Sequence, residues 1–351
     1  MKTNDTDAGI TAVRKIFQVL KIDKEWSLIS ERGFTWWGHR YAQRVWAEEP
    51  FEGGGIPIIR INAETEFLIN PKNSAKAKDH LAIYLMATSL YGLTVDDKTD
   101  MINFRCSAFV HEENLEWLGP LFSLATIMQA VEAETWGDIF ASKYRLWPCH
   151  SQHPESGHRQ ERDDMLNILE HFVIPEGKKP VNSICEVDFK TASKTLNDLD
   201  LLSTYSEHGL TAYVPFGGES SLLQVENNAD HPRLGKGLLM RLHLPTEEIR
   251  LAYQINGSLI LDMNTNEQVS WPTGHFLGSW CLGPAGENII APVFVSFVPA
   301  VVCNPTVLIN MVFNMVGHNR WAEGYFFAFD RDSKRPLREH RNLEEYEQLL
   351  N

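Results

Sequence analysis

The stretch GLLMRLHLPTEEIRLAYQINGSLILDM (Gly237–Met263) decides the fold, because it joins an alternating strand to an amphipathic helix. Every second residue from Leu238 to Leu244 is apolar, and Arg241 and His243 occupy two of the positions between them. Successive side chains of a strand point to opposite faces. We therefore expect a strand with one face in the core and the other partly exposed, with Arg241 and His243 on the exposed face.

The same stretch predicts where the strand ends and a helix begins. Pro245 cannot donate to a strand ladder, and Thr246 is a residue type that caps the first amides of a helix. The two glutamates that follow favour the positive end of a helix dipole. We expect one continuous helix from Thr246 to about Met263.

An earlier segment, Ile56–Leu90, shows the same order of strand and helix and opens with the similar pattern IPIIRIN. Pairs of similar residues also recur at similar separations along the chain: Arg60 with Arg241, Gly33 with Gly209, and Trp136 with Trp321. Recurrence at a nearly constant separation indicates an internal repeat. We therefore expect two copies of one unit.

Hydrophobic periodicity predicts the same order of elements in both halves: helix, three strands, helix, two strands, helix. The predicted fold class is α+β, with two tandem α-β-β-β-α-β-β-α units whose antiparallel sheets carry helices on one face. The predicted domains are a first unit at residues 1–140, a linker with a short helix at 141–185, a second unit at 186–325 and a charged C-terminal tail at 326–351. The tail is expected to end in a short helix at Leu343–Leu350.

The composition limits the classes of partner. The chain has 351 residues, 43% of them hydrophobic, which is enough to bury the cores of two domains. A net charge of −14 disfavours attraction to phosphate backbones and anionic lipid, so we expect no nucleic-acid partner. An acidic chain can present a face complementary to a basic peptide, although the same charge also serves solubility.

The cysteines and the N-terminus favour the cytoplasm. The 5 cysteines are odd in number and widely spaced, without a Cys-x-x-Cys pair, so they predict neither a disulfide framework nor a zinc ribbon. The first residues are polar where a secretory signal would need an apolar core. We expect a cytoplasmic protein.

One uncharged segment, Asn288–Gly317, is long enough to cross a bilayer. Three prolines interrupt it, three asparagines dilute it, and Val293–Val298 has the β-branched and aromatic composition of a strand. We predict a buried strand followed by a buried helix, and no membrane span.

An aromatic and cationic cluster is the main candidate for a binding surface. Its members are Trp36, Trp37, His39, Arg40, Tyr41, Arg44 and Trp46. Such residues are enriched at binding hot spots, and strand alternation allows one tryptophan to face solvent beside an arginine. The alternative is that these residues form packed core. With the exposed face of the later strand, the candidate binding residues are Trp36, Trp37, Arg40, Arg44, Arg241 and His243.

The weak candidates for metal ligands are Cys149, His150, His153 and His158. Their spacing matches no common zinc finger, and a polar loop with histidines is more often a solvated linker. We expect no metal, no cofactor and no catalytic residue, because no nucleophile elbow, Walker loop or dinucleotide fingerprint occurs. A metal-dependent enzyme or a small-ligand-binding protein that uses this loop, closed by Glu161 or Asp163, remains the alternative.

The order of elements and the GLLMRLHLP-like junction resemble the type III secretion chaperone-like superfamily, which includes the YbjN-like sensory transduction regulators. The resemblance covers roughly Ala8–Trp136 and Val187–Trp321. It implies a small α+β unit that often dimerises and holds a partner protein on exposed sheet and helix surface, without catalysis. Two such units in one chain would form an intramolecular pseudo-dimer. We therefore expect a non-enzymatic protein that binds a protein or peptide, and homo-oligomerisation remains open.

Overall fold

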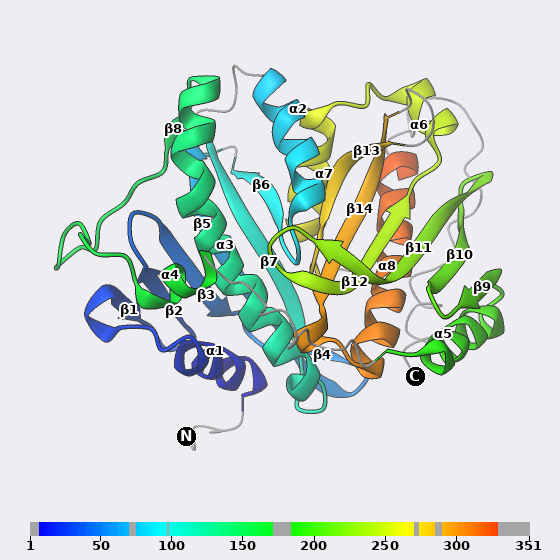
Figure 1. The fold of residues 1–351 in the computed structure, drawn as a ribbon, viewed down its shortest axis with the longest axis horizontal. Coiled ribbons are helices and arrows are strands. Elements are labelled where there is room, and N and C mark those ends of the chain that lie inside the picture. The colour runs from blue at the N-terminus through cyan, green and yellow to red at the C-terminus, as the bar shows by residue number, and fades with distance from the viewer. Residues whose placement is uncertain are drawn as a thin grey trace.

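The computed structural model describes residues 7–69, 75–96, 98–170, 184–269, 274–284 and 290–328. These residues form two antiparallel sheets with helices, which confirms the α+β class (Figure 1). The helix expected at Leu343–Leu350 lies outside the described residues.

The first half forms the larger sheet, of the order β1-β2-β3-β5-β7-β6, with β4 and β8 paired to β5. Its elements are α1 (Ala8–Val19), η1 (Lys24–Trp26), β1 (Ser27–Ile29), β2 (Gly33–Trp37), β3 (Ala42–Ala47), β4 (Phe51–Gly53), β5 (Ile56–Ile69), α2 (Ala75–Tyr84), η3 (Leu85–Ala87), β6 (Gly92–Asp96), β7 (Met101–Val110) and α3 (Leu115–Tyr144). The segment between the halves contains β8 (Trp147–Pro148) and α4 (Asp164–Glu170).

The second half forms a sheet of the order β13-β14-β12-β11-β10-β9. Its elements are α5 (Glu186–Asp198), β9 (Ser203–Ser206), β10 (Gly209–Phe216), β11 (Glu219–His231), β12 (Gly235–His243), α6 (Thr246–Ala252), α7 (Gly257–Val269), β13 (Ser279–Pro284), β14 (Ile290–Pro299), η4 (Ala300–Val302) and α8 (Pro305–Ala328).

The two halves have the same topology. Matched in chain order, β1, β2, β3, β5, β6 and β7 correspond to β9, β10, β11, β12, β13 and β14, and the order of these strands across each sheet is the same. Strand register extends the match to single residues, because Gly33 lies opposite Trp46 just as Gly209 lies opposite Glu226. With Gly33 matched to Gly209, as predicted, the strand order of one sheet coincides with that of the other, which fits two tandem copies of one unit.

The same registers correct another predicted pair. They match Arg241 with Glu64 and match Arg60 with Gly237, so the expected equivalence of Arg60 and Arg241 is wrong. A slip by an even number of residues keeps the alternation of a strand and leaves its core face in place. The alternation of apolar residues therefore could not distinguish the predicted match of Arg241 with Arg60 from the observed match of Arg241 with Glu64.

Each sheet buries one face under helices. Helices α1 and α3 lie on the first sheet, and α5 and α8 lie on the second. The alternation predicted for β12 is confirmed, because Leu238, Met240 and Leu242 have 0% exposure whereas Arg241 and His243 are half-buried. Burial of these apolar side chains supplies the main favourable free energy of folding in each core.

The halves meet through two equivalent backbone contacts. Phe276, just before β13, exchanges backbone hydrogen bonds of 2.8 and 3.2 Å with Ser107 of β7. Phe297 of β14 donates its backbone N–H to Ser89, just before β6, at 3.3 Å. Register makes Ser107 equivalent to Phe297 and Ser89 equivalent to Phe276. The two contacts are therefore exchanged by an approximate two-fold relation, as in an isologous dimer interface.

Helices α2 and α7 lie beside each other at the junction of the halves (Figure 1). The backbone N–H of Gly257, at the start of α7, donates to Asp79 of α2 at 2.6 Å. A Cβ at Gly257 would lie 2.2 Å from the backbone of Lys78, so this close approach requires glycine.

The helix expected from Thr246 to Met263 is two helices. Tyr253 has extended backbone angles and ends α6, and Asn256 accepts the backbone N–H of Leu259 at 3.0 Å to begin α7. Thr246 does not cap α6, whose N-cap is Pro245 without a side-chain bond. The chain turns at Tyr253 because α7, rather than α6, packs on α2 and on β6 of the other half.

Several predicted boundaries also differ. Each unit has an additional outer strand, β1 or β9, of 3 or 4 residues, which is too short and too exposed to show alternation. Helix α3 continues to Tyr144 and α8 to Ala328, beyond the predicted unit ends at residues 140 and 325. The predicted linker is also partly structured, because β8 joins the first sheet.

Within the uncharged segment, the described residues 290–317 form β14, η4 and the first part of α8, which confirms the predicted strand and helix. None of the helices in the described parts of the chain has the length and apolar character that crossing a bilayer requires.

Candidate functional site

The second sheet has one face that turns away from α5 and α8. Register places a row of side chains on it, contributed by β10, β11 and β12: Thr211, Tyr213, Leu222, Gln224, Leu239, Arg241 and His243. All are half-buried or exposed, and Tyr213 is 48% exposed. We call these seven residues the open face of the second sheet.

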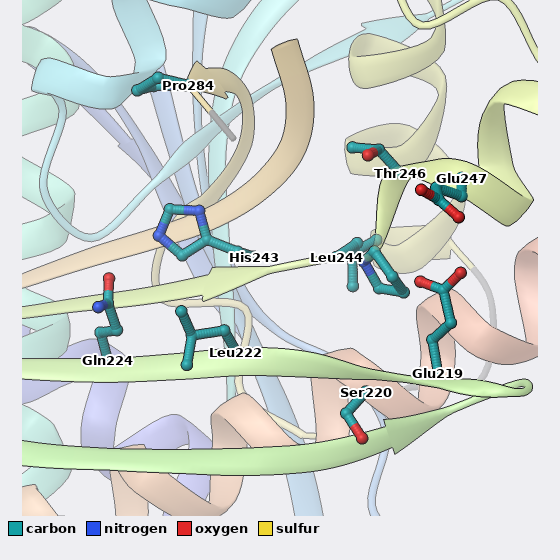
Figure 2. Close-up of a pocket in the computed structure, with 10 residues that line it drawn as sticks. Glu219, Ser220, Leu222, Gln224, His243, Leu244, Thr246, Glu247 and Pro284 are labelled. Atoms are coloured by element: carbon teal, nitrogen blue, oxygen red, sulfur yellow. The ribbon is translucent and has the colours of Figure 1, made fainter. Parts of the chain in front are cut away.

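The open face of the second sheet includes part of a hollow of about 500 Å³. Figure 2 shows Leu222, Gln224 and His243 projecting from neighbouring strands into it. The turn after β12 and the start of α6 close one end, where Glu247 contributes a carboxylate, and Pro284 of β13 contributes to the wall. The lining is mixed, because Leu222 and Pro284 are apolar, whereas Gln224, His243 and the carboxylates of Glu219 and Glu247 can form hydrogen bonds.

His243 is the chemically distinctive residue of this hollow. Its Nε2 atom is buried, and no described residue forms a hydrogen bond with it. Burial lowers the pKa of the imidazole, and the neighbouring Arg241 lowers it further. The ring is therefore neutral near pH 7, with one nitrogen that donates and one that accepts a hydrogen bond.

Arg241 projects from the same face of β12. Its Nη2 atom lies 3.0 Å from Glu226 of β11, and about a third of its side chain is exposed. The described contacts between the halves include those of β6 and β7 with β13 and β14, of α2 with α7, and of Arg233 in the β11–β12 hairpin with Glu132 of α3. Arg241 and His243 therefore lie where the sequence predicted them, on the non-core face of their strand.

The two predicted tryptophans do not form a binding surface. Trp36 is 0% exposed and faces the core, and Trp37 on the opposite side of β2 is only 6% exposed. The Trp37 Nε1 atom donates to the hydroxyl of Ser151 at 2.8 Å, and its ring lies edge-on to His153. The expectation that one tryptophan faces solvent is wrong, because Ser151 and His153 of the segment after α3 pack on Trp37.

Arg40 holds the β2–β3 turn against α3. Its backbone N–H and its Nε atom contact the carboxylate of Glu134 at 2.7 and 3.1 Å, and its guanidinium also contacts Asp138. Glu134 is itself buried. Arg40 is therefore a structural residue, because its hydrogen-bonding capacity is used within the fold.

Arg44 is the predicted residue of the first sheet that remains exposed. Its guanidinium lies 5.2 Å from the ring centre of Trp46 on the same strand, within the range of a cation–π interaction. Arg105 of β7 lies 5.5 Å from the same ring. The aromatic and cationic surface predicted from the sequence is thus centred on Trp46, not on Trp36 or Trp37.

The four candidate metal ligands do not form one site, because three of them have separate partners and the fourth is exposed. Cys149 lies 3.6 Å from Glu66, His150 lies 3.2 Å from Asp138, His153 accepts two backbone N–H groups of its own turn, and His158 is exposed. Burial raises the pKa of the Cys149 thiol to about 12, so it is not a thiolate at neutral pH. Among the described residues, no three histidine, cysteine, aspartate or glutamate side chains are grouped to hold a metal ion. Asp163, the acid proposed to close the loop, lies 3.3 Å from Arg159.

The open face of the second sheet also contains residues that were not among the predicted binding residues, such as Tyr213, Leu222 and Gln224. The alternation of LTAYV places Tyr213 on the side opposite Leu210, Ala212 and Val214, so its exposure could have been predicted. Its place in one row with Leu222 and His243 could not be predicted, because that depends on the pairing of β10 with β11 and of β11 with β12.

No family model matches the chain, and no curated protein and no solved structure shows significant similarity to it.

Proposed function

We propose that this chain is a non-catalytic, cytoplasmic protein-binding protein, chaperone-like or regulatory in its action, built as an intramolecular pseudo-dimer. In this proposal the open face of the second sheet holds a segment of a partner protein. The observation that carries the proposal is the hollow lined by His243, on a sheet face that turns away from the described helices α5 and α8 and combines apolar and hydrogen-bonding groups. The resemblance in element order to the type III secretion chaperone-like superfamily, in which sheet and helix surfaces hold partners, is consistent with it.

The chemistry of the hollow supports hydrogen bonding more than catalysis. His243 has no serine, cysteine or carboxylate as a hydrogen-bond partner among the described residues, which a nucleophile and base arrangement requires. The half-buried imidazole of His243 and the side-chain amide of Gln224 both line the hollow and can form hydrogen bonds with an incoming segment. Leu222 provides apolar contact area next to His243, and Tyr213 extends that area on the neighbouring strand β10.

Quantitative capture from native lysate tests the proposal. The full chain is immobilised in parallel with two variants, Arg241→Glu and Tyr213→Ala, and the recovered proteins are compared. A matched control is Val187→Ala, which truncates a 67% exposed residue on α5, away from the sheet. We expect the same proteins to be recovered by the wild type and by Val187→Ala, and to be reduced several-fold in both open-face variants.

The folded state of each variant is measured by circular dichroism and thermal unfolding. Because Arg241 and Tyr213 are partly exposed, we expect both variants to remain folded. Equal recovery by all four proteins would contradict a partner site on this face. Unfolding of Arg241→Glu would show instead that the surface is buried in the protein.

A further inference from the structure

The charged C-terminal tail contains a basic stretch. Of residues 331–341, five are lysine or arginine and two are acidic, whereas the chain as a whole has a net charge of −14. Three glutamates follow later in the tail, at Glu344, Glu345 and Glu347. Residues 331–341 are therefore a local cationic stretch on an acidic protein, and we call them the basic segment. Such a stretch is attracted to carboxylates of the same chain.

The helix that precedes the basic segment ends beside the hollow of the second sheet. Near the end of α8, Glu323 accepts the backbone N–H of Gly217 at 2.8 Å, two residues before Glu219 of the hollow. The ring of Phe326 lies 5.2 Å from that of Tyr253, which ends α6, and α6 begins at the wall of the hollow. The end of α8 thus lies next to two elements that border the hollow (Figure 1).

The hollow is acidic at the end that α8 approaches. Figure 2 shows the carboxylates of Glu219 and Glu247 directed toward each other at this end. None of the residues that line the hollow is a lysine or an arginine. On the same face, Arg241 is paired with Glu226 at 3.0 Å. Arg250 of α6 forms no ion pair with Glu247. A cation that enters this end of the hollow therefore meets carboxylates and no competing cation among the lining residues.

We propose that the basic segment docks on the acidic end of this hollow, within the same chain, and excludes a partner segment from it. Charge and position both select this occupant, because the segment supplies the cations that the lining lacks and follows a helix that ends beside it. Lys334 comes six residues after Ala328, the last described residue. Six residues reach about 20 Å when extended, which is about twice the spacing of packed layers. The segment can therefore pass from the helix side of the sheet to its open face.

As a form of regulation, this inference rests on the function proposed above, because it concerns the same hollow. The docking itself does not depend on that function, since it can be observed in the purified protein without a partner. A segment tethered in the same chain acts at an effective concentration of about a millimolar. Even weak docking would thus compete with a partner segment.

Zero-length crosslinking of the purified full chain tests the docking. A carbodiimide joins a lysine to a carboxylate only where the two are in contact, and Lys334 is the sole lysine after Lys236. Peptide mass spectrometry then locates the bonds. We expect Lys334 to couple to Glu219 or Glu247. In a mixture of isotope-labelled and unlabelled chains, each coupled pair of peptides should come from one chain.

Charge variants assign the crosslink to the basic segment. Arg335→Glu combined with Arg338→Glu keeps Lys334 and should lower the yield several-fold. The matched control is Lys190→Glu with Lys194→Glu, which changes two exposed lysines of α5 on the other face of the sheet and should keep the wild-type yield. Unfolding curves verify that every variant is folded. Coupling of Lys334 mainly to other carboxylates, coupling between chains, or an unchanged yield after the two arginine reversals would overturn the inference.

Capture from native lysate tests the exclusion separately. The variant with Arg335→Glu and Arg338→Glu should recover several-fold more partner protein than the wild type. Equal recovery of a partner by both proteins would contradict the exclusion. Recovery of no partner by either protein, with the Lys334 crosslink present, would contradict the proposed function while supporting the docking.

Discussion

The two halves share one topology and one register, yet they differ in the residues that cross to the other half. The β11–β12 hairpin of the second half places Arg233 against the buried carboxylate of Glu132 in α3, which also accepts the hydroxyl of Tyr84. The equivalent turn of the first half instead forms the short β4–β5 hairpin, which packs Phe51 on Phe109 of its own half. A duplicated unit can thus keep its sheet while each copy acquires its own interface contacts.

The largest effect is expected from Arg233→Met. Removal of Arg233 leaves Glu132 buried without its cation, and burial already raises the pKa of that carboxyl. Loss of one partner of a buried pair costs about 3 kcal/mol of unfolding free energy. Chemical denaturation of the wild type and of Arg233→Met measures this loss of unfolding free energy.

The matched control for this change is Lys236→Met. Lys236 lies 2.6 Å from Asp230 on the same hairpin, but that pair is exposed. Its removal is expected to cost about 0.5 kcal/mol or less. Similar losses in both variants would show that the contact with Glu132 does not hold the halves together.

The next effect is a pH dependence of stability. It should arise at the contact of Phe276 with Ser107 and not at the equivalent contact of Phe297 with Ser89. His275 precedes Phe276 and accepts the backbone N–H of Phe109 through Nδ1, whereas its equivalent before Ser89 is Thr88. Burial, followed by His318 and His111, lowers the pKa of His275 from 6.5 to about 4. The unfolded chain therefore binds a proton that the folded chain excludes. Stability should be complete above pH 6.5 and fall as the pH decreases toward 4, by up to about 3 kcal/mol.

His275→Asn tests this assignment, because the asparagine oxygen can accept the Phe109 N–H but does not titrate. Stability of the variant between pH 7 and pH 4 should depend less on pH than that of the wild type. Thr88→Val is the control at the equivalent position and should keep the wild-type slope. Identical slopes for wild type and His275→Asn would exclude His275 as the source.

A smaller effect is expected within the core of the second half. Trp280 donates to the buried carboxylate of Glu267 at 2.5 Å, and His318 contacts the same carboxylate at 2.6 Å. The first half has Leu93 at the position of Trp280 and so lacks this group. Trp280→Phe should cost about 2 kcal/mol, which is typical for a hydrogen bond to a charged group. In a double-mutant cycle with Glu267→Gln, additive losses would contradict a direct interaction.

The smallest effect distinguishes the two helix starts after β12. Asn256 accepts the backbone N–H of Leu259, so Asn256→Ala should cost about 1 kcal/mol. Thr246 forms no cap, so Thr246→Ala should change the unfolding free energy by less than about 0.5 kcal/mol. If thermal unfolding showed that Thr246→Ala destabilises the protein more than Asn256→Ala, the result would favour the continuous helix that was predicted from the sequence.

Local patterns predicted the elements and faces well, because they depend on periodicity within a few residues. The face of β12, the strand and helix of Asn288–Gly317, and the duplication itself were all predictable from alternation and element order. The break at Tyr253 was not, since the cause is the packing of α7 on α2, which lies far away in the sequence.

The candidate sites show the same limit. Arg241 and His243 were placed correctly because their exposure follows from the alternation of one strand. Trp37 was misplaced because its cover comes from Ser151 and His153, more than a hundred residues later. The residue match between the two sheets depends on strand register. A single sequence therefore does not reveal strand register, nor which distant segment packs on an otherwise exposed side chain.

The most direct test of a partner site on the open face of the second sheet is site-specific photocrosslinking. A benzophenone amino acid replaces Tyr213, which is 48% exposed on that face, or Val187, which is 67% exposed on α5. After irradiation in native lysate, we expect a discrete crosslinked partner from position 213 and none from position 187. Equal labelling at both positions, or a discrete partner only at position 187, would contradict the proposed binding face.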